Sequence, residues 1–85
     1  MITKETLTIR KAELFAEVDN NARKRAKEFV ENELAKIGES NAVIKRGQDI
    51  ITCPVYLVPE YVGEELAAAG FEPEKPDKWT FKIEW

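Results

Sequence analysis

The densest group of side chains with a chemistry of their own is a basic cluster in the first third of the chain. Arg23, Lys24, Arg25 and Lys27 follow one another almost without a gap, and guanidinium and ammonium groups are the usual ligands of phosphate oxygens. On a helix, Arg23, Lys24 and Lys27 would lie opposite the apolar positions, with Arg25 at the edge of that face. The cluster therefore offers contacts with a nucleic-acid backbone as one hypothesis.

A solvated helix face is the competing interpretation of the same cluster. Oppositely charged residues stand four apart, the spacing of helical ion pairs, at Asp19–Arg23, Lys24–Glu28 and Lys27–Glu31. The cluster contains no aromatic side chain to stack a base, and the net charge of −3 argues against general nucleic-acid affinity. The solvated face is favoured, and a nucleic-acid-binding regulator, to which Lys45 and Arg46 could contribute, stays the alternative.

Two tyrosines bracket the junction between a predicted strand and a predicted helix. Tyr56 and Tyr61 have Val58 and Pro59 between them, and tyrosine is enriched in the cores of protein interfaces. They could line a small surface for a protein partner, although simple packing at the rim of the core is favoured.

Catalytic and metal chemistry find little support. The chain has no histidine, which removes the commonest acid, base and metal ligand near neutral pH. Cys53 is the only cysteine, which excludes an internal disulfide, and we expect it to be a buried apolar residue. Glu72, Glu74 and Asp77 match no calcium loop and are expected on a solvated strand. The sequence therefore predicts no enzyme, no cofactor and no metal site.

The strongest structural pattern lies at the end of the chain. Apolar and polar residues alternate from Trp79 to Trp85, which places Trp79, Phe81, Ile83 and Trp85 on one face of a strand. A second strand is expected over residues 49–58, which Pro54 either restricts to a sheet edge or interrupts with a bulge. A helix over residues 59–69 follows, beginning at Pro59 and ending at Gly70, and residues 71–85 form a hairpin.

Residues 11–37 have a helical pattern, with apolar residues three and four apart, at Phe15, Val18, Ala22, Ala26, Phe29, Val30, Leu34 and Ile37. Residues 1–10 suit either a strand or a helix, and the helix is slightly favoured. Gly38 is the expected left-handed stop, and residues 39–48 form a loop in which Val43 and Ile44 tuck under the helix.

These elements predict one α+β domain over residues 1–85, in the order α-β-α-β-β. The long helix packs on a small three-stranded mixed sheet of spatial order 1-3-2, with strand 79–85 at the centre because it alone lacks proline. A helix of that length outreaches a seven-residue strand. Part of it must overhang and expose Phe15 or Ile37 unless a second copy, residues 1–10 or a partner covers it.

The chain also resembles a group of proteins. The segments 26–29, 65–71 and 79–85, with the sequences AKEF, ELAAAGF and WTFKIEW, resemble small, largely uncharacterised proteins of bacteriophages and prophages of Gram-positive bacteria. The resemblance implies an accessory product that acts in the host cytoplasm, often by binding a host protein.

The polar stretch from Met1 to Arg10 and the short apolar runs elsewhere predict neither a signal peptide nor a membrane span, and hence a cytoplasmic protein. The leading hypothesis is a non-enzymatic protein-binding module, phage-like, that binds a host protein or a second copy of itself. Its candidate contacts are Arg23, Lys24, Lys27, Tyr56 and Tyr61.

Overall fold

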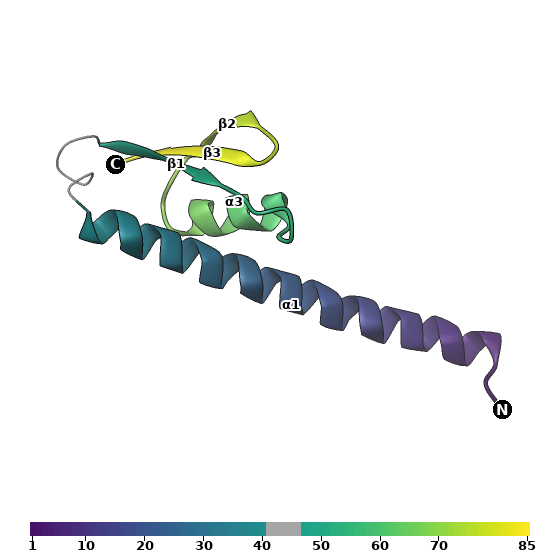
Figure 1. Cartoon of the computed structure of the whole chain (residues 1–85). Helices are drawn as coiled ribbons and strands as arrows, with labels where there is room; N and C mark the ends of the chain where they lie inside the picture. The colour runs from purple at the N-terminus through teal and green to yellow at the C-terminus, as the bar shows by residue number, and fades with distance from the viewer. Residues whose placement is uncertain (41–46) are drawn as a thin grey trace.

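The computed structural model describes residues 1–40 and 47–85, and its dominant element is helix α1 (Lys4–Glu39; Figure 1). Thr3 is the N-cap of the helix, and its Oγ1 accepts a hydrogen bond from the Thr6 amide at 3.2 Å. It continues unbroken through Asp19 and its two following asparagines. The predicted helix is confirmed, and most of the ambiguous residues 1–10 belong to it.

The helix ends differently from the prediction. Gly38 lies inside α1, and its φ angle is not in the left-handed region. Ser40 is the capping residue, and its extended backbone turns the chain away. Its amide and its hydroxyl both donate to the carbonyl of Ile37, at 3.1 and 2.9 Å. The predicted loop with Val43 and Ile44, and the basic pair Lys45 and Arg46, fall in residues 41–46, outside the described residues.

The three strands form one sheet, consisting of β1 (Gln48–Thr52), β2 (Glu74–Asp77) and β3 (Thr80–Glu84). The spatial order is β1-β3-β2, so the predicted order and the central position of the last strand are confirmed. Both pairings are antiparallel, with Ile51 opposite Phe81 in the first. The sheet is therefore antiparallel, where we had expected a mixed one. Strands β1 and β2 run parallel to each other, but they do not pair because β3 lies between them.

Strand β1 is shorter than the expected 49–58. The amide of Cys53 still donates to the carbonyl of Trp79, at 2.7 Å. Pro54 then has no N–H to continue the ladder, and its carbonyl accepts a hydrogen bond from Leu57 at 3.0 Å, which closes a turn. This turn leaves Val55 and Tyr56 exposed to solvent.

Helix α3 (Pro59–Ala68) begins and ends where the sequence indicates. Pro59 occupies the first turn, where a missing N–H costs nothing. Gly70 has a φ of 95°, the left-handed conformation that glycine adopts most easily. The amides of Gly70 and Phe71 donate to the carbonyls of Ala67 and Leu66, the two hydrogen bonds of a Schellman stop.

Helix α3 lies between the sheet and α1 (Figure 1). We had expected α1 itself to cover the aromatic face of the last strand. Instead α3 contacts it so closely that a methyl group added at Gly63 would lie 3.1 Å from Cε1 of Phe81. The buried core draws on both helices, two strands and the turn between β1 and α3, with Ala26, Val30, Ile51, Cys53, Leu57, Val62, Leu66, Phe81 and Ile83.

The predicted aromatic face is confirmed for its central members. Phe81 and Ile83 are buried, and Trp79 packs against the core from a partly buried position. Trp85 remains exposed at the rim. The burial of alternate residues on β3 follows from the period of two along a strand.

The molecule is elongated because α1 is longer than the rest of the fold. Its extents are 64 × 24 × 21 Å, and the radius of gyration is 17.2 Å, against about 12 Å for a compact chain of this length. The sheet, α3 and the C-terminal half of α1 form the head, and the N-terminal half of α1 extends from it as an arm (Figure 1). The predicted overhang is present at the N-terminal end, whereas Ile37 packs against the core.

Candidate protein-binding surface

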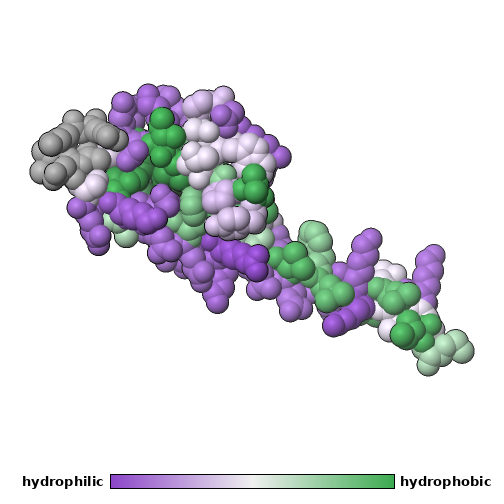
Figure 2. Space-filling view, in the orientation of Figure 1, coloured by the Kyte–Doolittle hydropathy of each residue, from purple (hydrophilic) through white to green (hydrophobic). Residues whose placement is uncertain are grey.

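The arm carries an apolar face that nothing in the described structure covers. Phe15 is 72% exposed, Val18 66% and Leu7 59%, and Figure 2 shows apolar side chains among polar ones along the arm. The exposed large apolar side chains of this face are Leu7, Leu14, Phe15 and Val18, whereas Ile9, also exposed, lies on the opposite side of the helix. Burial of one such side chain is worth roughly 1.5–3 kcal/mol, so contact of this face with another surface would be favourable.

Four of the arm residues lie in one line along the helix. Leu7, Lys11, Leu14 and Val18 are spaced four, three and four residues apart, which keeps them on one narrow face. We call these four residues the seam. Phe15 stands beside Leu14, on the edge of the same face.

A cluster of polar side chains lies where the arm leaves the head. The guanidinium of Arg23 on α1 donates to the carboxylates of Asp19, at 3.1 Å, and Glu64 on α3, at 3.0 Å. Its central carbon lies 4.1 Å from the centroid of the Tyr61 ring, and the Tyr61 hydroxyl donates to Asp19. These contacts join α1 to α3 at the point where the arm leaves the head.

Ionisation of this cluster is coupled to its hydrogen bonds. The pKa of Asp19 is lowered, first by the hydrogen bond from Tyr61 and then by that from Arg23, because both stabilise the carboxylate. The pKa of Tyr61 is raised, chiefly because its hydroxyl donates to Asp19. The pKa of Arg23 is raised for the same reason, by its hydrogen bond to Asp19.

Two of the sequence-predicted contact residues, Arg23 and Tyr61, thus contact each other within the chain. Arg23 was placed on the helix face opposite the apolar positions, and this was wrong, since it lies over the ring of Tyr61. The expected ion pair between Asp19 and Arg23 is present. Among the described residues, neither Lys24 nor Lys27 forms an ion pair, so the pairs expected with Glu28 and Glu31 are not formed.

Tyr56 is separate from this cluster and lies near the root of the arm. Its side chain is 74% exposed. It lines a shallow hollow together with the turn residue Leu57 and the α1 residues Val18, Asn21, Ala22 and Arg25. Tyr56 therefore continues the exposed face of the arm onto the head.

Sequence reasoning missed Leu7 because residues 1–10 were ambiguous between strand and helix, and it did not include Lys11 and Leu14 in the apolar pattern. The apolar pattern was followed only from Phe15 onward. The seven-residue spacing of Leu7 and Leu14 is the signal that identifies the seam.

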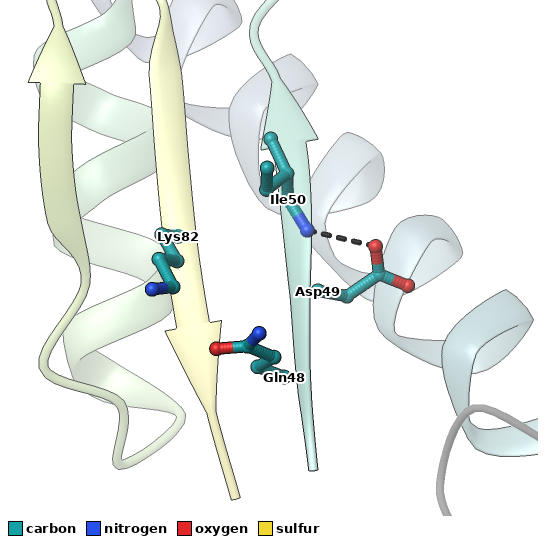
Figure 3. Close-up of a pocket in the computed structure, with 4 residues that line it drawn as sticks. All are labelled: Gln48, Asp49, Ile50 and Lys82. Carbon is teal, nitrogen blue, oxygen red and sulfur yellow. Dashed lines mark hydrogen bonds between the residues drawn. The ribbon is translucent and has the colours of Figure 1, made fainter. Parts of the chain in front are cut away.

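Elsewhere on the described surface, an apolar hollow is lined by Leu34, Ile37, Gly38, Phe71, Ile83 and Trp85. A hollow on the sheet is lined by Gln48, Asp49, Ile50 and Lys82 (Figure 3), where the Asp49 carboxylate accepts a hydrogen bond from the Ile50 amide at 2.7 Å. Cys53 is buried, as expected, and burial raises the pKa of its thiol. Within residues 1–40 and 47–85, no group of three histidine, cysteine or acidic side chains is arranged to hold a metal ion.

The helices that the structure describes include none with the length and hydropathy of a membrane span. Comparison with known proteins gives no further identification. No protein family, curated protein or solved structure matches the chain.

Proposed function

We propose that the chain is a protein-binding module whose binding surface is the seam with the adjacent Phe15. The observation that carries the proposal is the exposure of this apolar face on a helix that is anchored to a folded head. An exposed row of apolar side chains on an anchored helix is the kind of surface that a groove or another helix binds.

The charges of the arm favour a protein partner over a lipid surface. Amphipathic helices that bind anionic membranes carry an excess of Lys and Arg on the polar face. Between Lys4 and Val18 the basic residues are balanced by acidic ones, in the set Lys4, Glu5, Arg10, Lys11, Glu13 and Glu17. Such a balanced face suits an interface with charges of both signs.

Nucleic-acid binding through the basic cluster is the second candidate, and it now depends on fewer residues. Arg23 is engaged with Asp19, Glu64 and Tyr61, whereas Lys24 and Lys27 are exposed. Binding through these two lysines would weaken steeply with salt and would be lost in Lys24→Glu/Lys27→Glu. Salt-insensitive binding, or none at low ionic strength, would remove this candidate.

A photo-crosslinking amino acid at Phe15 tests the protein-binding proposal in the cells that produce the chain. The matched control carries the same amino acid at Glu13, which is also exposed but lies on the other side of the arm. We expect irradiation to give protein adducts from position 15 and few from position 13. Equal yields at both positions, or no adduct at either, would contradict the proposal.

A further inference from the structure

The seam has the residue spacing of one helix of a coiled coil. In heptad terms Leu7, Leu14 and Asn21 share one core position, and Lys4, Lys11 and Val18 share the other. This stripe is narrower than the apolar face of a helix that packs on a globular core. We propose, building on the protein-binding function above, that the seam pairs antiparallel with the seam of a second copy of this chain.

Charge complementarity selects the antiparallel register. Arg10 and Glu17 flank the seam on one side, and both are exposed. In an antiparallel pair related by a two-fold axis, this side of one helix faces the same side of the other. When Leu7 faces Val18 of the second copy, Arg10 faces Glu17 of the second copy, and the symmetry repeats the pair.

In the other arrangements, Arg10 and Glu17 face either a like charge or an uncharged residue. A shift of one heptad toward the head sets Glu17 against Glu17 of the second copy. A shift the other way sets Arg10 against Arg10. A parallel pair sets Arg10 against Phe15 and Glu17 against Ala22, so neither charge has a partner. Like charges opposite one another select against the shifted registers.

The rest of the seam tolerates the antiparallel register. Lys11 faces Leu14 of the second copy, where its aliphatic stem can cover the leucine while the ammonium reaches water. Phe15, on the other flank of the seam, faces Thr8 of the second copy. The exposed ring of Phe15 is then partly covered.

The antiparallel register brings the start of one helix close to the head of the other copy, at the hollow that Val18 and Tyr56 line. Asp19, which anchors the arm to α3, lies roughly a third of a turn away from the seam on the helix surface. The paired helix of the second copy begins at Lys4, which comes to lie beside Asn21. Asn21 borders the hollow that Tyr56 lines. The two heads therefore stand at opposite ends, and each Tyr56 lies near the start of the other helix.

A charge exchange tests the register in the full-length chain, with sedimentation equilibrium as the measurement. Arg10→Glu places two glutamates against each other twice in the dimer, and Glu17→Arg does the same with arginines. Two attractive pairs become two repulsive ones, so we expect each variant alone to dimerise about ten-fold more weakly. An equimolar mixture of the two variants restores both attractive pairs, and we expect its affinity to return to that of the wild type.

A control separates this effect from changes within one helix. Arg10 forms an intrahelical ion pair with Glu13 at 3.3 Å, and Glu13→Gln removes that pair without touching the seam. We expect Glu13→Gln to dimerise like the wild type. Circular dichroism of each variant should show unchanged helix content.

The outcomes are separable. Weakened single variants with rescue in the mixture support the proposed pairing. Unchanged single variants, or weakened ones without rescue in the mixture, overturn the antiparallel register. If the wild type stays monomeric while position 15 crosslinks to a different protein, the second copy is the wrong occupant and the protein-binding function stands. If it stays monomeric and no adduct forms, both fail.

Discussion

The guanidinium of Arg23 stacks over the ring of Tyr61, 4.1 Å from its centroid, and so fastens the long helix α1 to the short helix α3. Both residues looked from sequence like candidates for contact with a partner. Their actual contact is with each other, through a cluster completed by Asp19 and Glu64. This cluster lies where the arm leaves the head.

We expect Arg23→Gln to lower the unfolding temperature, because it removes the stacking and both ion pairs of the cluster. Lys24→Gln is the matched control, since among the described residues Lys24 forms no ion pair. Its unfolding temperature should equal that of the wild type. Thermal unfolding followed by circular dichroism distinguishes the two, and equal melting of both variants would show that the cluster does not stabilise the fold.

The Tyr61–Asp19 hydrogen bond gives stability a definite pH dependence. The pKa of Asp19 is lowered by folding, so its contribution is present above about pH 4, the ordinary carboxyl value, and is lost as pH falls. The pKa of Tyr61 is raised, so its contribution is present below about pH 10 and is lost as pH rises.

The variant Tyr61→Phe isolates this effect. We expect the difference in free energy of unfolding between wild type and variant to be constant between these limits and to shrink at both ends. Urea unfolding at a series of pH values measures it. A difference that does not change with pH would mean that the hydrogen bond contributes nothing to stability.

Phe81 at the centre of the sheet is completely buried, and Phe81→Ala should cost about 3–5 kcal/mol of unfolding free energy. Tyr56→Ala removes a ring that is 74% exposed, and it should change stability far less. Both are measured by urea unfolding of dilute protein. Similar losses from the two variants would contradict the central packing of β3.

Two glycines in helices should respond oppositely to alanine. Gly38 lies in α1 with no described atom within 4 Å of an added methyl group, so Gly38→Ala should raise stability by up to about 1 kcal/mol. At Gly63 the methyl group would lie 3.1 Å from the buried ring of Phe81, so Gly63→Ala should lower stability by about 1 kcal/mol or more. A gain at both sites would show that α3 can move away from the sheet.

Local patterns carried much of the fold. The alternation around Phe81 located the last strand, its lack of proline placed it at the centre of the sheet, and Pro59 and Gly70 marked both ends of α3. These signals are reliable because each depends on a few neighbouring residues. The expectation that α1, and not α3, covers β3 was wrong because packing between distant elements leaves no local signature.

Only part of the candidate binding surface could be predicted from the sequence, for a related reason. The overhang followed from comparing the lengths of helix and strand, which is simple geometry. The partners of Arg23 on α3, Glu64 and Tyr61, could be predicted only by knowing that α3 lies beside α1. No spacing within either helix contains that information.

Hydrogen exchange of the arm tests the central claim most directly. If the seam binds a second copy, the amides of residues 8–18 should exchange quickly in dilute protein and become protected as concentration rises, while Arg10→Glu at the same high concentration stays unprotected. The amides around Ala26 and Val30, buried in the head, should be protected throughout. Exchange of residues 8–18 that does not depend on concentration would contradict the pairing of the arms.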